Sequence, residues 1–283
     1  MKDFKRCIKV LGEPYYKTKY CLIYNMDSLK AMKKLRKSNV KFNLTVTSPP
    51  YNIGKEYETV MDQSKYCDWT ELWIKRVHDL TTDNGALLLN VGYTKLEDKA
   101  RAIPIPYLIW DSSPFFLNQE IIWYYKAGVS CKKYLSPRNE KILWYVKDKD
   151  DYTFNLDDIR IPSLYKDKRF NPLGKNPTDV WDIPKVTSGC GKTDERTKHP
   201  AQTPLEVVNR IVKGFSNKRD LVLEPFLGSG TMAESCIRNK RYVIGFEKKR
   251  EYFRMAKKRI ENVLRKRKIK SKDNKTKRRK LQK

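Results

Sequence analysis

The chain has 283 residues, 39% of them hydrophobic and 12% aromatic, which suits one large domain or one domain with an insert. Its net charge of +28 comes from 61 Lys and Arg against 33 Asp and Glu, and such an excess predicts a polyanionic partner, most commonly nucleic acid. Six scattered cysteines and only two histidines exclude a disulfide framework and form no zinc pattern, so we expect no metal.

The positive charge is unevenly distributed along the chain. Residues 264–283 contain 12 Lys and Arg and one Asp, a net +11, and this run predicts a basic, disordered tail. The remaining +17 lies in residues 1–263, so the body is basic without the tail. The first residues are charged and no apolar run reaches the roughly 20 residues of a membrane span, so we expect a protein of a reducing compartment without membrane contact.

The pattern of apolar residues predicts strands that alternate with helices as far as residue 146. In chain order we expect a strand at 19–24, a helix capped by Asp27 and Ser28, a strand at 42–47, a helix begun by the capping box Asp68–Glu71 and ended by Gly85, a strand at 86–91, a helix at 103–112, and strands at 120–126 and 141–146. The order strand, helix, strand indicates a mostly parallel α/β sheet.

Periodicity fades between residues 147 and 198, where Pro, Gly, Asp and Lys accumulate, and we interpret this segment as an irregular insert. After it we expect a helix that begins around Thr203 and Pro204, a strand at 221–224, a helix from Thr231, and a strand at 242–246. The predicted parts are therefore residues 1–146, the insert 147–198, residues 199–263 and the tail 264–283.

The segment TSPPYN, residues 47–52, follows a strand that reads as buried. Proline cannot donate to a sheet ladder, so Pro49 and Pro50 end the strand and leave two stiff carbonyls between a Ser48 hydroxyl and the Tyr51 ring. Carbonyl, hydroxyl and ring together can hold a planar group that carries an amine. From these letters alone, a plain strand-ending turn remains the alternative.

The segment EPFLGSGT, residues 224–231, places a glycine turn between a strand and a helix. Gly228 and Gly230 allow close approach of a ligand to the backbone, and Glu247 follows the next strand, where a carboxylate can bind both ribose hydroxyls. This pattern does not distinguish a dinucleotide from S-adenosylmethionine, and a tight turn with a surface Glu remains open. A nucleotide-like cofactor, a planar amine and a basic body together indicate an amino-methyltransferase that acts on a base.

With these motifs, the sequence resembles the β group of DNA amino-methyltransferases over most of residues 19–252. The resemblance implies a class I methyltransferase fold, a Rossmann-like, seven-stranded, mostly parallel α/β sheet in which the catalytic motif precedes the cofactor motif. It also implies S-adenosylmethionine as cofactor, double-stranded DNA as partner, a cytoplasmic enzyme of prokaryotic or phage type, and a cognate restriction endonuclease that acts on the same site without a stable complex. A monomer and a homodimer are both compatible with it.

The resemblance also implies roles for particular residues. The catalytic motif corresponds to Ser48, Pro49, Pro50 and Tyr51. The cofactor-binding positions correspond to Asp27, Thr47, His199, Gln202, Thr203, Phe226, Gly228, Ser229, Gly230, Thr231 and Glu247. Asp27 is equally well explained as a helix cap. Glu224 stands where Asp is commoner in the family, and Asn139 precedes Glu140 where a His is often found, so we do not assign that pair a catalytic role.

Contacts with DNA are expected from two basic segments. One is the loop between the strands at 120–126 and 141–146, and the other is the insert, which we interpret as the target-recognition segment. The candidate residues are Lys132, Lys133, Arg138, Arg160, Lys168, Arg169 and Lys175. A solvated basic loop is an equally good explanation of the first three.

The expected reaction is transfer of a methyl group to an exocyclic amine of a flipped-out base. Ser48 Oγ and the Pro49 carbonyl would accept the N–H bonds of the amine and free its lone pair, and Tyr51 would stack on the base. Ser at this position is commoner in enzymes that methylate cytosine N4, so we expect cytosine N4, with adenine N6 as the alternative. A non-catalytic nucleic-acid-binding module and a nicotinamide-dependent oxidoreductase are the alternatives from other classes.

Overall fold

The computed structural model of the chain describes residues 2–281 apart from 129, 164–168, 170 and 187–192, and it describes the side chains of the last helix up to Arg267. Nine strands of this described chain form one sheet in the order β1-β2-β11-β10-β3-β4-β8-β7-β9. The strands are β1 (Tyr16–Lys17), β2 (Cys21–Tyr24), β3 (Phe42–Thr47), β4 (Thr81–Val91), β7 (Phe116–Tyr124), β8 (Asn139–Val146), β9 (Val180–Asp182), β10 (Leu221–Glu224) and β11 (Tyr242–Phe246).

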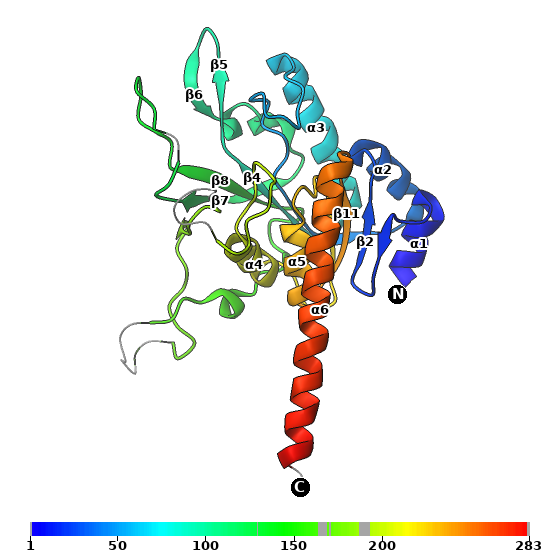
Figure 1. Ribbon diagram of the computed structural model, residues 1–283. Coiled ribbons are helices and arrows are strands. Elements are labelled where there is room, and N and C mark those ends of the chain that lie inside the picture. The colour runs from blue at the N-terminus through cyan, green and yellow to red at the C-terminus, as the bar shows by residue number, and fades with distance from the viewer. Residues whose placement is uncertain (1, 129, 164–168, 170, 187–192, 282–283) are drawn as a thin grey trace.

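Helices cover both faces of the sheet (Figure 1). One hydrophobic cluster joins one face of the sheet to α4 (Leu205–Gly214), α5 (Thr231–Arg238) and α6 (Arg250–Leu281). A second cluster joins the other face to α1 (Lys2–Leu11), α2 (Ser28–Leu35) and α3 (Gln63–Leu80). A separate antiparallel hairpin, β5 (Tyr93–Leu96) and β6 (Ala100–Pro104), projects from the sheet after β4.

The parallel centre of the sheet follows from the buried apolar strands. β2, β11, β10, β3 and β4 are mutually parallel, whereas β8 pairs antiparallel with both β4 and β7. Every residue of β2 and β10 is buried, as in a strand covered by helices on both faces. The expected mostly parallel α/β sheet is confirmed, and its seven expected strands are extended by the short edge strands β1 and β9.

Two predicted helices differ from those observed. α3 begins at Gln63, because Asp62 accepts a hydrogen bond from the Ser64 N–H, and it ends at Leu80, so Gly85 lies inside β4. The helix expected at 103–112 is replaced by the end of β6 and two short 3-10 helices. Pro104 and Pro106 explain this difference, since proline cannot donate within a helix.

The predicted insert and tail both contain regular structure. Within 147–198, β9 adds to the sheet beside β7, and Leu156–Ile159 forms a 3-10 helix. α6 continues through 264–281, where the sequence predicts a disordered tail. Leu264 packs against the core and the Arg267 guanidinium lies 4.7 Å from the centre of the Tyr20 ring, so the body extends at least to Arg267. No helix among the described residues has both the length and the apolar character required to cross a membrane.

Candidate active site

A cavity of about 1070 Å³ opens at the carboxyl ends of the parallel strands, where both sequence motifs lie. β3 and β10 are neighbours in the sheet, but α3, which follows β3, packs on one face, and α5, which follows β10, packs on the other. Such a switch point leaves a crevice between two strand ends, which is where open α/β sheets bind ligands. The topology therefore brings the segments 47–52 and 224–231 to one crevice.

A buried hydrogen bond between Thr47 and Glu224 joins the two strand ends. Thr47 Oγ1 donates to Glu224 Oε1 at 2.7 Å, and the Phe226 N–H donates to the same oxygen at 3.2 Å. Burial raises the pKa of Glu224 to about 8, although both donors oppose the rise. Thr47 lines the cavity, and its hydroxyl bonds to Glu224 at the end of β10.

Glu247 connects two turns that border the cavity. Its Oε2 accepts a hydrogen bond of 2.9 Å from the Gly228 N–H, and its Oε1 accepts one of 2.8 Å from the Lys249 N–H. Burial raises the pKa of Glu247, and these N–H groups oppose the rise. Each carboxylate oxygen has a second lone pair, so Glu247 can also accept hydrogen bonds from the two hydroxyls of a ribose.

The two glycines of the turn have different roles. Gly228 has φ +50° and lines the cavity, and a Cβ atom there would lie 3.1 Å from His199 Nε2. Gly230 has φ +78°, but it is not among the residues that line the cavity, and its Cβ would lie 2.8 Å from the Cα of Ala256 in α6. Gly230 therefore allows α5 and α6 to pack closely, and its expected contact with the cofactor stays a prediction.

Asp27 and an aromatic group also border the cavity. Asp27 Oδ1 accepts a hydrogen bond of 3.0 Å from the Lys30 N–H, so this residue caps α2, and it also lines the cavity. The Phe226 ring lies 5.6 Å from the rings of both Trp69 and Trp73. Trp69 also lines the cavity. The aromatic wall can therefore contact a flat ring such as adenine.

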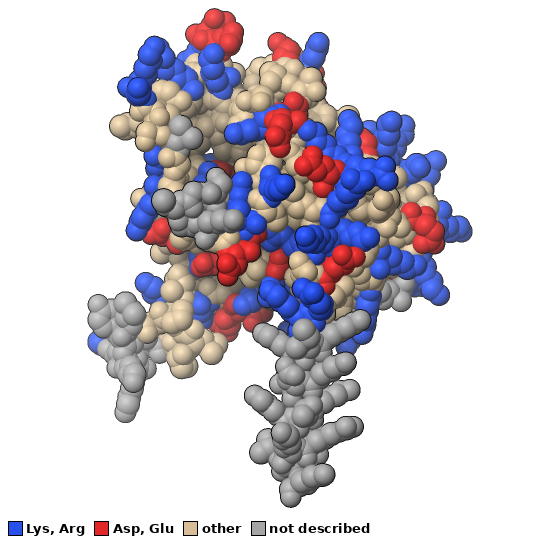
Figure 2. All heavy atoms as spheres, in the orientation of Figure 1, with Lys and Arg blue, Asp and Glu red and all other residues tan. Residues whose placement is uncertain are grey.

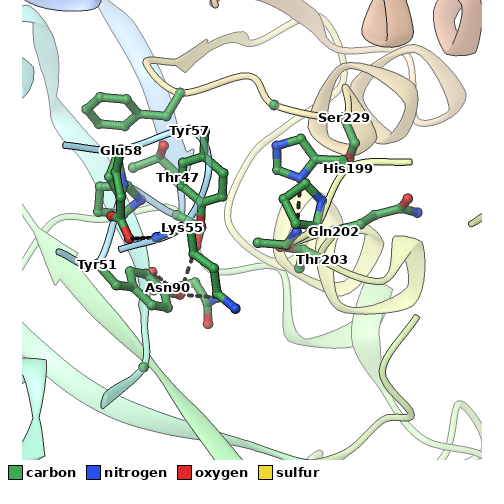
Figure 3. A pocket seen from close by; sticks show the side chains of 18 of the residues that line it. Thr47, Tyr51, Lys55, Tyr57, Glu58, Asn90, His199, Gln202, Thr203 and Ser229 are labelled. Atoms are coloured by element: carbon green, nitrogen blue, oxygen red, sulfur yellow. Dashed lines mark hydrogen bonds between the residues drawn. The ribbon is translucent and has the colours of Figure 1, made fainter. Parts of the chain in front are cut away.

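Residues 199–203 form the opposite wall of the cavity, and Figure 3 shows His199, Thr203 and Ser229 across from Thr47 and Tyr51. His199 Nδ1 accepts a hydrogen bond of 3.2 Å from the Ala201 N–H, and burial lowers the pKa of His199 to about 4. This imidazole is therefore neutral near pH 7. Ser229 Oγ lies 3.0 Å from Thr231 Oγ1, and both residues line the cavity as expected.

Gln202 lines the cavity, but its amide is already hydrogen-bonded to neighbouring residues. Its Oε1 accepts from the N–H and the hydroxyl of Thr197 at 2.9 and 2.8 Å, and its Nε2 donates to the Glu195 carbonyl at 2.8 Å. These contacts hold the segment before α4 in shape. The sequence did not indicate this positioning role, because both partners lie in the irregular segment.

The segment after Tyr51 covers the cavity and was missed by sequence reasoning. Glu58 accepts hydrogen bonds from three backbone N–H groups within 52–55, which folds the segment back on itself. The Tyr57 ring stacks on His199 with centroids 5.8 Å apart and 20° between the planes. The Tyr252 hydroxyl donates to Glu56 Oε1 at 2.6 Å, so this cover also contacts α6.

The catalytic motif is held by hydrogen bonds on both sides of its prolines. The Tyr66 hydroxyl donates to the Pro50 carbonyl at 3.0 Å, and Ser48 Oγ lies 2.8 Å from the Tyr51 hydroxyl. The Tyr51 ring packs on Gly92, where an added Cβ would lie only 2.9 Å from the ring. Ser48, Pro49, Pro50 and Tyr51 all line the cavity, and their expected catalytic role stays a prediction.

Glu140 and Asn90, which the sequence did not assign to the site, contact Tyr51, and Lys185 contacts Glu140. The Tyr51 hydroxyl lies 3.1 Å from Glu140 Oε2, and Asn90 Nδ2 donates to the same carboxylate oxygen at 2.8 Å. Lys185 Nζ lies 3.3 Å from Glu140 Oε1 and 3.9 Å from the centre of the Tyr125 ring. Burial and then Glu140 raise the pKa of Tyr51, so the phenol stays protonated.

Glu140 could have been found from the sequence, because it lies in the strand pair that matches the family. However, Asn139 beside it departs from the family pattern, so the sequence gives Glu140 no clear signal. Lys185 carried no such signal, since it lies in the predicted insert and reaches the site only through the tertiary fold. Burial lowers the pKa of Lys185, but Glu140 and Tyr125 together outweigh this effect, so its pKa is raised and the side chain is charged.

The candidate DNA-binding residues occupy different environments. Lys132 and Lys133 are exposed in the connection between β7 and β8, and Arg138 of the same connection lines the cavity. The Arg160 side chain is only 12% exposed, because it binds Asp157 at 2.6 Å and the Gly174 carbonyl at 3.2 Å. These contacts hold Arg160 within the segment 157–174, and its expected contact with DNA stays a prediction. Lys175 and Arg169 are exposed, and Lys168 lies outside the described residues.

Comparison with known proteins agrees with this geometry. The profile of the N6_N4_Mtase family, described as DNA methylase, matches residues 42–258. The chain is 48% identical to Type II methyltransferase M.ScaI of Streptomyces caespitosus, over 89% of this chain and 85% of that protein. It is 31% identical to DNA adenine methyltransferase YhdJ of Escherichia coli K12, over 84% of this chain and 82% of that protein. The fold resembles that of PvuII DNA methyltransferase (cytosine-N4-specific), with a TM-score of 0.70 at 20% identity, over 89% and 93% of the two chains.

Proposed function

This chain belongs to the N6/N4 DNA methylase family, and we propose that it methylates the exocyclic N4 of a flipped-out cytosine in double-stranded DNA. The methyl donor is S-adenosylmethionine. Its similarity to Type II methyltransferases supports a role as the modification enzyme of a restriction–modification system. The cognate endonuclease would recognise the same DNA site and need not bind this chain.

The cavity offers groups suited to S-adenosylmethionine. Glu247 has lone pairs available for the ribose hydroxyls, and Phe226 with Trp69 forms an apolar wall for the adenine. Gly228 leaves the turn after β10 without a side chain where the ligand would pass. The cofactor supplies an electrophilic methyl group, and its methionine end would lie near His199 and Thr203.

The geometry around Ser48 carries the proposal. A phenol has one proton, and the Tyr51 hydroxyl lies within hydrogen-bond distance of both Glu140 and Ser48 Oγ. When Tyr51 donates to the Glu140 carboxylate, its oxygen accepts a hydrogen bond from the Ser48 hydroxyl, and the lone pairs of Ser48 Oγ can accept a hydrogen bond from an N–H of the target amine. This hydrogen bond would favour a pyramidal nitrogen whose lone pair attacks the methyl group as its bond to the cofactor sulfur breaks, which would leave S-adenosylhomocysteine and release one amine proton to solvent. Ser at this position is commoner in family members that methylate cytosine N4, and a neutral hydroxyl is compatible with that target, so we propose cytosine N4.

The proposal is tested by supplying duplex DNA and S-adenosylmethionine with a labelled methyl group and then digesting the DNA to nucleosides. We expect label in N4-methylcytosine. Ser48→Ala should lower turnover by at least about 100-fold, the typical effect of removing one preorganised transition-state contact. Cofactor affinity, measured by calorimetry, should stay within about threefold, because this hydroxyl acts on the target amine.

Adenine N6 is the second candidate, because the similar protein YhdJ is an adenine methyltransferase. The same digestion separates the two, since label found only in N6-methyladenine would overturn the cytosine assignment. A chain that binds DNA but transfers no label would support a non-catalytic binding role. We assign sequence recognition to the segment 147–198, which brings Lys185 to the catalytic residues and carries the exposed Lys175.

A further inference from the structure

Two projections border the catalytic side of the cavity. The β5–β6 hairpin follows the carboxyl end of β4, and the β7–β8 connection, residues 125–138, lies at the same edge because Val91 of β4 pairs with Lys141 of β8. Figure 1 shows both projections extending from the same side of the sheet. The β7–β8 connection is therefore close to any DNA that presents a base to Ser48.

The β7–β8 connection exposes an apolar tip. Leu135 is 95% exposed, the highest exposure among the large hydrophobic side chains of the described chain, and the adjacent Tyr134 is 43% exposed. A lone exposed leucine needs no explanation, but this one lies in a connection that contains four Lys and Arg and no Asp or Glu. Lys132 and Lys133 beside the tip are exposed and suited to phosphate contacts.

Two hydrogen bonds within the β7–β8 connection shape the tip and its base. The Cys131 N–H donates to Ser136 Oγ at 2.8 Å across the tip, and the Tyr125 N–H donates to the Arg138 carbonyl at 2.9 Å at its base. A groove of about 550 Å³ runs between Leu135 and the β5–β6 hairpin. This groove and the main cavity share Tyr93, Pro137, Arg138 and Asn139 in their walls, so the tip lies at the rim of the site.

We propose that Leu135 is a wedge that enters the base stack of the DNA duplex when the target base turns into the cavity. This inference rests on the proposed function, since it requires a base to leave the stack. Removal of a base opens an apolar gap in the duplex, and apolar side chains that enter base steps are a known means of stabilising opened DNA. Lys132 and Lys133 would bind the backbone phosphates on either side of the gap.

The test compares two duplexes that carry the site methylated by the wild-type chain. In one the target base is paired, and in the other it lies opposite an abasic position, so less of the energy for flipping must come from the protein. Leu135→Ala should lower kcat/KM on the paired duplex by about tenfold and on the abasic duplex by less than about twofold. Leu135→Met should keep most of the activity on both, because methionine is also a long apolar side chain.

Leu72→Ala is the matched control, because Leu72 is an exposed leucine on α3 that lines neither the cavity nor the groove. It should leave both rates unchanged. Equal losses on the two duplexes for Leu135→Ala, or no loss on either, would overturn the wedge. A change of oligomeric state in Leu135→Ala with normal methylation would also overturn it, because the tip would then be an interface between copies of the chain.

A second readout needs no turnover. A 2-aminopurine placed next to the target base brightens when the stack opens, so binding of the wild-type chain should raise its fluorescence and binding of Leu135→Ala should raise it much less. Equal brightening by the two proteins would contradict the wedge. Failure of the proposed function would appear instead as the absence of labelled methylated base in the nucleoside digest of the wild-type reaction. The comparison of the two duplexes is valid whether the target base is cytosine or adenine.

Discussion

At the scale of single residues, the buried carboxyl group of Glu224 makes the stability of the folded chain depend on pH. Its pKa is raised from 4.5 to about 8 by burial, so the folded chain keeps a proton that the unfolded chain releases between these values. The contribution to stability is complete below pH 4.5 and is lost as the pH rises through about 8. The stability of the wild-type chain should therefore fall with pH in this range.

Glu224→Gln removes this titration and keeps a side chain of the same shape. The free energy of unfolding of the wild type, relative to that of Glu224→Gln, should fall by up to about 1.4 kcal/mol per pH unit between pH 5 and 7.5. Denaturant titrations of both proteins at several pH values measure this difference. Parallel stability curves for the two proteins would mean that Glu224 has no raised pKa.

Glu247 is expected to bind the ribose hydroxyls of the cofactor through the lone pairs that its backbone contacts leave free. Glu247→Ala should weaken S-adenosylmethionine binding by at least about tenfold, since two hydrogen bonds to a charged group would be removed. Glu247→Gln, which keeps one acceptor oxygen, should weaken it less. Calorimetric titration without DNA measures both affinities, and unchanged binding in Glu247→Ala would remove Glu247 from the cofactor site.

At the scale of elements, the packing of α5 on α6 depends on Gly230. Gly230→Ala would incur the left-handed backbone cost of about 1–2 kcal/mol and would also force its Cβ against the Ala256 backbone. Gly12 offers a matched control, because it has φ +86° and no atom within 4 Å of an added Cβ. Gly230→Ala should therefore lower the unfolding free energy by about 1–3 kcal/mol more than Gly12→Ala does.

Denaturant unfolding measures both variants. Similar losses would show that the backbone conformation alone matters at Gly230. A Gly230→Ala protein that has normal stability but binds S-adenosylmethionine more weakly would instead place this glycine in the cofactor site.

Local sequence signals predicted some elements much better than others. The sequence predicts β3, β10 and β11 because each is a mainly apolar run that is followed by proline or ends at or next to a glutamate. It predicts the start of α2 from the cap residue Asp27. The start of α3 was missed because Asp68 and Glu71 imitate a capping box, whereas the true cap is Asp62.

The part of the site that could not be predicted depends on contacts between distant segments. Tyr51 meets Glu140 across 89 residues of sequence, and Lys185 comes from an insert with no periodicity. The motifs predicted the strand ends, since proline and glycine impose local backbone geometry. They could not show which side chains of other segments would complete the cavity.

At the scale of the whole molecule, positive charge covers much of the face in Figure 2, with fewer acidic side chains among the Lys and Arg. Residues 268–283 add nine Lys and Arg against one Asp beyond the last described side chain. This charge should strengthen DNA binding without sequence preference, because phosphate neutralisation releases counterions.

A chain that ends at Arg267 keeps the packing of Leu264 and Arg267 against the body. Its DNA affinity should depend less steeply on salt, with the slope of log affinity against log salt reduced by up to roughly 0.9 for each phosphate that the shortened chain leaves unneutralised. Turnover at saturating DNA should stay near that of the full chain. Fluorescence anisotropy at several salt concentrations measures the slope, and an unchanged slope would mean that the tail does not bind phosphate.

The order of the strands also constrains how the protein is made on the ribosome. β2 and β3 are separated in the sheet by β11 and β10, which are the last strands in the chain. During synthesis, β2 and β3 therefore lack their central neighbours until residues 221–246 have left the exit tunnel. The gap in the middle of the sheet closes late, and the crevice forms at the same moment. A nascent chain that still lacks β10 and β11 therefore has no active-site crevice. We expect methyltransferase activity only from chains in which synthesis has passed β11.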